Sequence, residues 1–184
     1  MEDEDLVARA EEAARRLHDG QMRKGEAGEP YAAHLQEVAT LVAAWGGDPL
    51  AVALAWLHDT VEDNPGCEVE DVEEEFGAEL AALVAELTDD DAVDEPTRRR
   101  RQVEAARRAS PRAALVKLAD KTSNLRGVAV APPAGWSRDY TLAYVAWGEE
   151  VVAALPEPLP RQGLDAFAQA AHAARIVATA APAA

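Results

Sequence analysis

Cysteine is nearly absent from this 184-residue chain, since Cys67 is the only one. A single cysteine excludes an intrachain disulfide and a thiolate-rich zinc site. The first stretch, "MEDEDLVARAEEA", lacks the basic-then-apolar order of a secretory signal. The chain also lacks any uncharged apolar run of the roughly 20 residues needed to span a bilayer. These absences predict a cytoplasmic protein without a membrane segment.

Basic residues are also scarce, because 18 Lys and Arg stand against 34 Asp and Glu, for a formal charge of −16. A charge of this size favours solubility and disfavours nucleic acid or a membrane surface as partner. It permits a small anionic ligand where local positive charge offsets the field. The composition leaves the oligomeric state open.

Aromatic residues make up only 5% of the chain, whereas alanine and leucine dominate a hydrophobic content of 48%. That composition favours helices, and the length suits one domain with a real core. We therefore expect an all-α, single-domain helical bundle, in which residues 156–184 form a connector and a helix packed on or extending residues 1–155. Periodicity and Gly/Pro breaks predict helices over 3–19, 32–45, 49–63, 97–109, 111–125, 137–155 and 164–178, with another after Gly77.

The stretch "AVALAWLHDTVEDNPG" ends an apolar run with a histidine and three acids. Residues four apart share one face of a helix. His58, Asp59, Glu62 and Asp63 therefore fit within an arc of roughly 140°. They form one polar sector, which is either solvated surface or a polar pocket in the bundle.

Two other helices supply inward-facing polar residues. His34 lies one turn before Val38 on an apolar stripe, so it faces the interior. Asp120 leads to Asn124 on a largely apolar helix, where an unpaired charge is costly to bury. These residues could meet the pair His58–Asp59 inside the bundle.

Neutral imidazole and carboxylate are the ligand set of a divalent transition metal such as Mn²⁺, Fe²⁺ or Zn²⁺. Such an ion lowers the pKa of a bound water molecule. Glu62 and Asp63, one turn further on, would orient that water or shuttle protons. In the alternative interpretation, His34 is an ordinary core histidine and the acids are solvated. Residues 98–101, "RRRR", are then an exposed helix face, although one or two could reach an anionic ligand.

Four motifs in this order make the chain resemble a known family: "RKGEAGEPYAAH", "LAWLHDTVEDN", "FGAELAALVAELT" and "KLADKTSNLR". They are similar to those of the HD-domain hydrolases of the alarmone (p)ppGpp, which comprise the hydrolase half of Rel/SpoT enzymes and the stand-alone small alarmone hydrolases of the Mesh1 type. The stretch "GWSRDYTLAYVAWGEEVV" also resembles the C-terminal helix of the stand-alone type. The resemblance covers about residues 5–155 and implies an all-α bundle of the HD-domain type.

Carried over position by position, the resemblance implies a role for each matching residue. The implied metal ligands are His34, His58, Asp59 and Asp120, with Mn²⁺ the usual ion. The implied catalytic pair, which activates and positions the attacking water, is Glu62 and Asp63. The implied substrate-binding residues are Arg23, Lys24, Asn124 and Tyr144.

The implied reaction is hydrolysis of the 3′-pyrophosphate of ppGpp or pppGpp, an activity of the stringent response, to GDP or GTP and pyrophosphate. One rival keeps the chemistry and changes the substrate to NADPH or another nucleotide. A second is a non-catalytic nucleotide-binding regulator, against which the intact Glu62, Asp63 and four ligands count. A third is a structural helical module with fortuitous polar residues.

Overall fold

The computed structural model describes residues 2–23, 28–89 and 92–180. Within these ranges the regular elements are helices, apart from one isolated β-bridge between Met22 and Pro30. The all-α prediction is therefore confirmed. In chain order the helices are α1 (Glu2–Leu17), α2 (Tyr31–Ala44), α3 (Pro49–Leu57), α4 (Thr60–Asp63), α5 (Val69–Phe76), α6 (Ala78–Leu87), α7 (Glu95–Ala106), α8 (Pro111–Val130), α9 (Arg138–Ala154) and α10 (Arg161–Ala180).

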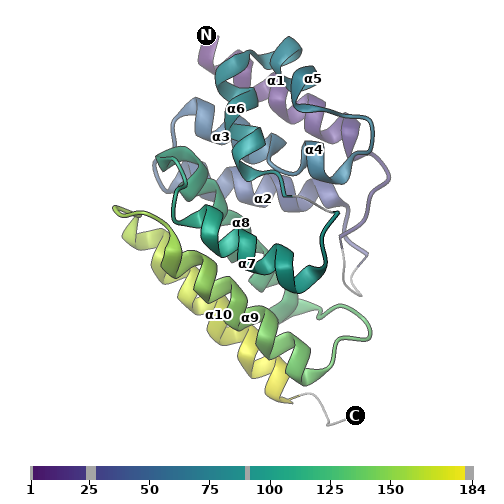
Figure 1. Ribbon diagram of the computed structural model, residues 1–184, viewed down its shortest axis with the longest axis vertical. Coiled ribbons are helices and arrows are strands. Elements are labelled where there is room, and N and C mark those ends of the chain that lie inside the picture. The colour runs from purple at the N-terminus through teal and green to yellow at the C-terminus, as the bar shows by residue number, and fades with distance from the viewer. Residues whose placement is uncertain (1, 24–27, 90–91, 181–184) are drawn as a thin grey trace.

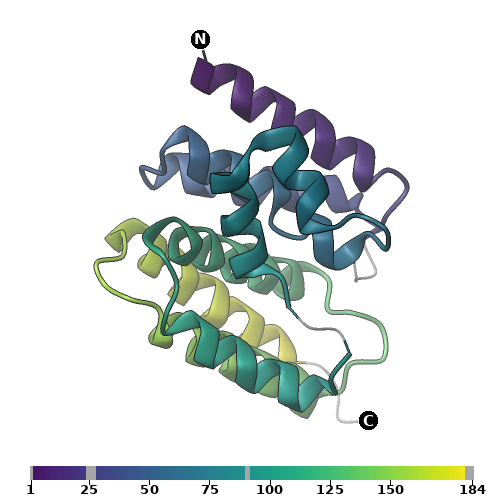
Figure 2. The same cartoon turned by 45° about the horizontal axis from the view of Figure 1, so that its top comes forward.

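Helix α8 is the centre of the bundle. It packs against α2, α3 and α6 on one side and against α9 and α10 on the other. Figures 1 and 2 show this division, with α1 to α6 together at one end and α9 and α10 side by side at the other. Helix α10 approaches α8 closely at Gly163, where an added Cβ would lie 2.8 Å from a methyl group of Leu118.

The starts of two helices follow from their capping residues. The side chain of Ser110 accepts a hydrogen bond from the amide of Ala113, and Pro111 occupies the first turn of α8. The side chain of Ser137 accepts one from the amide of Tyr140 and starts α9. Both caps satisfy amide groups that a helix leaves without partners.

The predicted continuous helix over 49–63 is wrong. Helix α3 ends at Leu57 and α4 begins at Thr60, with Asp59 at φ −103° and ψ 2° between them. Adjacent side chains on an unbroken helix diverge by about 100°. The break instead turns the side chain of Asp59 toward that of His58, so both reach one centre.

The acidic segment 68–76 lies between α4 and α6. It forms helix α5, started by a capping box between Glu68 and Asp71. Val72 is buried there, while most of the acidic side chains remain exposed. Because most residues of the segment are acidic, the few apolar positions that pack it against the bundle are not evident in the sequence.

A continuous apolar core surrounds the site and fixes the helices that carry it. Its largest fully buried side chains include Leu35, Val38, Leu54, Leu57, Val116, Leu118 and Leu125. In the part of the chain that the structure describes, no helix combines the length and apolarity required to traverse a membrane.

Candidate active site

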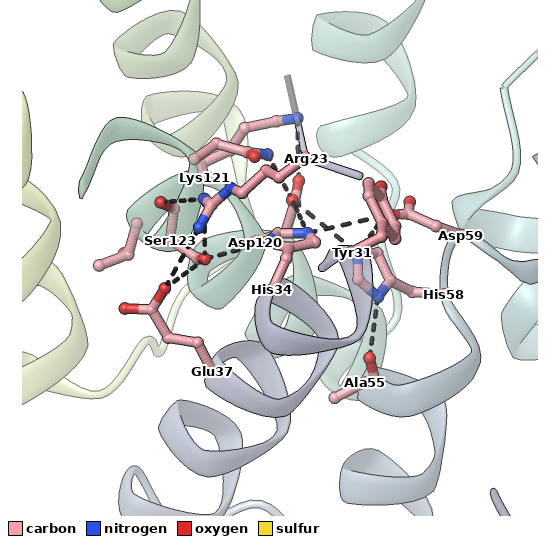
Figure 3. A network of polar contacts seen from close by, with 12 residues as sticks. Arg23, Tyr31, His34, Glu37, Ala55, His58, Asp59, Asp120, Lys121 and Ser123 are labelled. Carbon is pink, nitrogen blue, oxygen red and sulfur yellow. Dashed lines mark hydrogen bonds and ion pairs between the residues drawn. The ribbon is translucent and has the colours of Figure 1, made fainter. Parts of the chain in front are cut away.

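The structure gathers two histidines and an aspartate from separate helices into one buried cluster (Figure 3). His34 lies on α2, His58 follows α3, and Asp120 lies on α8. Each of them offers a ligand atom within 4.8 Å of the others. Their exposed fractions are 2%, 4% and 7%, respectively. Polar atoms buried this deeply need partners or an ion.

Asp59 lies against the same cluster. Its Oδ2 is 3.0 Å from His58 Nε2 and 3.7 Å from His34 Nε2. Oδ1 of Asp120 lies 3.8 Å and 3.5 Å from the same two nitrogens. Atoms that bind one transition-metal ion at about 2.1 Å are separated by roughly 3.0–3.6 Å. The spacing of the four side chains therefore suits a single ion.

Both histidines direct Nε2 toward this centre because Nδ1 is engaged elsewhere. His58 Nδ1 lies 2.8 Å from the carbonyl oxygen of Ala55, and His34 Nδ1 lies 2.9 Å from Ser123 Oγ. The buried Nε2 of His58 has no hydrogen-bond partner among the described residues. A buried nitrogen that makes no hydrogen bond and faces a second imidazole and two carboxylates fits the donor set of a divalent metal ion.

The two carboxylates are held by their own partners. The hydroxyl of Tyr31 donates a 2.6 Å hydrogen bond to Asp59 Oδ2. Lys121 Nζ lies 2.9 Å from Asp120 Oδ2, and Asn124 Nδ2 donates a 2.6 Å hydrogen bond to Asp120 Oδ1. Asn124 therefore contacts a candidate metal ligand, in addition to lining the cleft above it.

The charges of the cluster balance one another. Burial raises the pKa of Asp120, but the charge of Lys121 and the two nearby histidines hold it well below its usual range. The pKa of the Asp59 carboxyl is held low in the same way, chiefly by His58. Burial lowers the pKa of His58, but Asp59 and Asp120 outweigh this and raise it to about 10. The proton on His58 thus helps to balance the carboxylates, and a divalent cation would replace it.

Glu62 and Asp63 lie on α4, at the edge of the cluster. Both line the cleft, and the amide of Asp89 donates a 3.3 Å hydrogen bond to Glu62 Oε2. Burial, with the negative charges of Asp59 and Asp89, raises the pKa of Glu62 to about 7. A carboxyl with this pKa can both accept and donate a proton near neutral pH.

Helix α4 is fastened to the end of α1 by side-chain amides. Gln21 Nε2 donates to the carbonyl oxygen of Asp63 at 3.2 Å and to Asn64 Oδ1 at 2.9 Å. The buried His18 holds Gln21 in turn, with 2.7 Å between Nδ1 and Oε1. His18 thus positions the short helix that carries the acids and lies outside the ligand cluster.

The cluster lies in a cleft of about 660 Å³. Its aromatic lining residues are Tyr31, Trp136, Tyr140, Tyr144 and Trp147. Its basic lining residues are Arg23, Arg98, Arg99, Lys117 and Lys121. The guanidinium of Arg99 lies 5.2 to 5.6 Å from the centroids of three rings on α9. Aromatic rings beside cations favour a ligand that has both an aromatic base and negative charge.

Arg23 reaches the cleft from the loop before α2, and the predicted Lys24 lies outside the described residues. Arg23 Nη2 donates a 2.6 Å hydrogen bond to the carbonyl oxygen of Ser123, and Nη1 lies 3.4 Å from Glu29. The guanidinium also lies over Gly127, where an added Cβ would come within 2.9 Å of it. Arg23 is therefore tied to the helix that carries Asp120.

Sequence reasoning missed several residues that support the cluster. Tyr31 holds Asp59, Lys121 holds Asp120, and Ser123 contacts His34. Tyr31 and Ser123 lie within three residues of predicted ligands, but adjacency on a helix does not reveal the direction of a side chain. Lys121 was detectable in principle, because a lysine on a buried helix face next to an aspartate indicates an ion pair.

A buried His/Asp cluster carried by an all-α bundle defines a class of metal-binding helical proteins. The chain belongs to the HD domain family, which matches its residues 10–143. Membership in this family implies a divalent metal ion, and the cluster of His34, His58 and Asp120 is a possible site for it.

Within the family, the chain is similar to proteins named guanosine-3′,5′-bis(diphosphate) 3′-pyrophosphohydrolase MESH1. It is 42% identical to the Homo sapiens protein over 152 residues, which is 82% of this chain and 84% of that protein. It is 41% identical to the Drosophila melanogaster protein over 137 residues, or 73% and 76% of the two chains. A solved structure described as a metazoan ortholog of SpoT that hydrolyzes ppGpp superposes with a TM-score of 0.84 at 34% identity, covering 90% of this chain and 93% of that one.

Proposed function

We propose that the protein is a metal-dependent hydrolase that removes the 3′-pyrophosphate of ppGpp or pppGpp, yielding GDP or GTP and pyrophosphate. The observation that carries the proposal is the buried Nε2 of His58, which makes no hydrogen bond with the described residues and faces His34, Asp59 and Asp120 at the base of the cleft. The similarity to the MESH1 proteins over most of both chains supports this choice of substrate.

The metal would be held by His34, His58, Asp59 and Asp120, and we propose Mn²⁺ as the ion. When bound, a divalent ion lowers the pKa of a water molecule and offsets negative charge on the phosphate. Two imidazoles with two carboxylates suit such a borderline cation, and the absence of a cysteine ligand disfavours softer ions. We assign residues 1–155 to the catalytic unit and residues 156–184 to its C-terminal extension.

Glu62 is the residue that we assign to proton transfer. Its pKa of about 7 lets it accept the proton of the attacking water in its ionised form. The water oxygen then bonds to the phosphorus attached to the ribose 3′-oxygen, the bond from that phosphorus to the 3′-oxygen breaks, and the 3′-oxygen takes a proton. Asp63, on the same short helix, would orient the water.

The nucleotide would be held by the side chains around the cluster. Arg23 and Lys24 would contact phosphate oxygens, Asn124 would lie near the ribose, and Tyr144 would contact the base. Tyr144 is suited to this role because its ring lies 4.8 Å from that of Trp136 and 5.2 Å from that of Trp147. A polyanion can bind a chain of charge −16 because the metal and the basic residues Arg23 and Lys24 would make the local charge positive.

NADPH is the second candidate substrate, since it also has phosphate on the ribose of a purine nucleotide. Neighbouring aromatic side chains just before and along α9 support NADPH as a candidate, because the second aromatic ring of this nucleotide could stack on them. A non-catalytic nucleotide-binding regulator is the remaining alternative. We expect the protein to act in the cytoplasm on a small molecule, with neither nucleic acid nor membrane as partner.

The test is pyrophosphate release from ppGpp by purified protein, with Mn²⁺ and with a chelator, and phosphate release from NADPH in parallel. We expect turnover of ppGpp that depends on the metal. Turnover of NADPH alone would show that NADPH, and not ppGpp, is the substrate, and would leave the assignment of the site unchanged. Bound metal without turnover of either nucleotide would favour the regulator.

Two variants separate the assigned roles. Asp59→Ala should lose metal binding and activity together, whereas Glu62→Ala should retain the metal and lose most turnover. Asp165→Ala, at an exposed position on α10, is the matched control and should keep both. Near-normal turnover by Glu62→Ala would show that Glu62 does not activate water.

A further inference from the structure

Nδ1 of His34 is connected to a carboxylate through a serine hydroxyl, whereas Nδ1 of His58 contacts a backbone carbonyl oxygen. Ser123 Oγ lies 2.9 Å from His34 Nδ1 and donates a 2.6 Å hydrogen bond to Glu37 Oε2. Figure 3 shows the three side chains in this order, with Glu37 on the far side of Ser123 from the metal-ligand cluster. Ser123 is fully buried, with an exposed fraction of 0%.

The donor inventory of the hydroxyl fixes the direction of every bond in this chain of contacts. A serine hydroxyl has one proton to donate and two lone pairs to accept with. Its proton goes to Glu37, because a carboxylate can only accept. Arg23 Nη2, 3.2 Å from the hydroxyl oxygen, can only donate and takes one lone pair. The remaining lone pair faces His34, so His34 Nδ1 must be the donor.

This deduction determines the tautomer of His34 when the imidazole is neutral. With its proton on Nδ1, the lone pair is on Nε2, which lies 3.5 Å from Asp120 Oδ1 and 3.7 Å from Asp59 Oδ2. A ligand histidine that donates its other N–H toward a carboxylate is oriented and made more basic by it.

The carboxylate at the end of the chain stays ionised. Burial raises the pKa of Glu37, but the hydrogen bonds from Ser123 and Arg126 and the positive charges of Arg126 and Arg23 bring it below its ordinary value. Arg126 Nη1 lies 2.9 Å from Glu37 Oε1. Both oxygens of Glu37 are therefore engaged, and Oε2 is directed at the serine.

We propose that Ser123 and Glu37 are positioning residues that act through His34, forming a carboxylate–hydroxyl–imidazole relay that presents Nε2 to the metal. The inference rests on the metal site of the proposed function and extends it to two residues outside the ligand set. Because Arg23 bonds to the same serine, the relay also joins the arginine of the nucleotide-binding loop to a metal ligand.

The test compares Mn²⁺ affinity, by titration calorimetry, in Ser123→Ala and Ser123→Thr. Loss of such an outer partner typically weakens metal binding by 10- to 100-fold, so we expect about a tenfold loss in Ser123→Ala. Ser123→Thr keeps the hydroxyl and should restore affinity to within about twofold. The matched control is Thr122→Val, which removes a neighbouring buried hydroxyl whose one hydrogen bond among the described residues goes to the carbonyl of Leu118. It should bind Mn²⁺ as the wild type does.

A second readout does not depend on metal. In the metal-free protein, the proton on His34 Nδ1 should give a protected far-downfield NMR resonance that Ser123→Ala loses and Thr122→Val keeps. Wild-type Mn²⁺ affinity in Ser123→Ala, or an equal loss in Thr122→Val, would overturn the relay. If the wild type shows the resonance and binds no divalent ion, the His34–Ser123 bond is supported and the proposed metal-dependent function fails.

Discussion

Gly127 of α8 lies directly beneath the guanidinium of Arg23: a Cβ at position 127 would come within 2.9 Å of Arg23 Cζ and Nη2. Gly127→Ala should therefore displace Arg23 from the cleft. We expect KM for ppGpp to rise roughly fivefold, the equivalent of about 1 kcal/mol of lost binding. Steady-state kinetics with Mn²⁺ would measure the change.

The same substitution should not weaken the fold, because alanine is favoured over glycine in a helix by about 1 kcal/mol. Gly148→Ala on α9 is the matched control, since its Cβ would meet Leu125 at an ordinary 3.7 Å. It should raise the melting temperature and leave KM unchanged. An unchanged KM in Gly127→Ala would show that the position of Arg23 does not matter for the nucleotide.

Glu62 should make the metal-free protein less stable as pH rises. Its pKa is 4.5 ordinarily and about 7 in the folded protein. Between these values the folded state binds the proton and the unfolded chain does not, so the free energy of unfolding falls as pH rises. Relative to Glu62→Gln, the wild type should lose about 3 kcal/mol between pH 4.5 and pH 8. Urea unfolding of both proteins in chelator, with the exposed Glu70→Gln as control, would reveal this slope or its absence.

Much of the fold could be predicted from the sequence because its signals are local. Ser110 and Ser137 cap helices as their positions indicate. Apolar residues at helical spacing give the inward faces of α2 and α8. The break at His58–Asp59 could not be predicted, because nothing in "LAWLHDTVEDN" interrupts helical periodicity. It depends on contacts with distant residues, such as the hydrogen bond from Tyr31 to Asp59.

The candidate site divides in the same way. The residues that meet at its centre could be chosen because a histidine or an aspartate on an apolar helix face requires a partner. Apart from Lys121, the residues that orient them could not be chosen in this way. Ser123 is an unremarkable small polar residue in the sequence, and its contacts with His34 and Glu37 join residues 89 and 86 positions apart. Such pairs arise only from the packing of α2 against α8.

Metal binding should release protons. In the metal-free protein the pKa of His58 is raised to about 10, so His58 is protonated at neutral pH, and the pKa of His34 is also raised above that of a free imidazole. An ion bound to Nε2 must displace any proton there, so affinity should fall as pH is lowered. Calorimetric titration with Mn²⁺ at pH 7, in buffers of different ionisation enthalpy, should give one to two protons released per ion. A value near zero would contradict the assignment of the histidines as ligands.

Lys121 should stabilise the metal-free protein by balancing Asp120. The two side chains form a buried ion pair at 2.9 Å, and Lys121 Nζ also lies 4.5 Å from the ring centroid of Trp147. Removing one partner of a buried pair leaves an uncompensated charge, so Lys121→Met should cost about 3 kcal/mol in chelator. Saturating Mn²⁺ should recover part of this loss, because the ion compensates the same carboxylate and binds only the folded state. Thermal unfolding with and without metal would measure both effects, with the half-exposed Lys117→Met on the same helix as control. An equal loss with and without Mn²⁺ would mean that the ion does not bind Asp120.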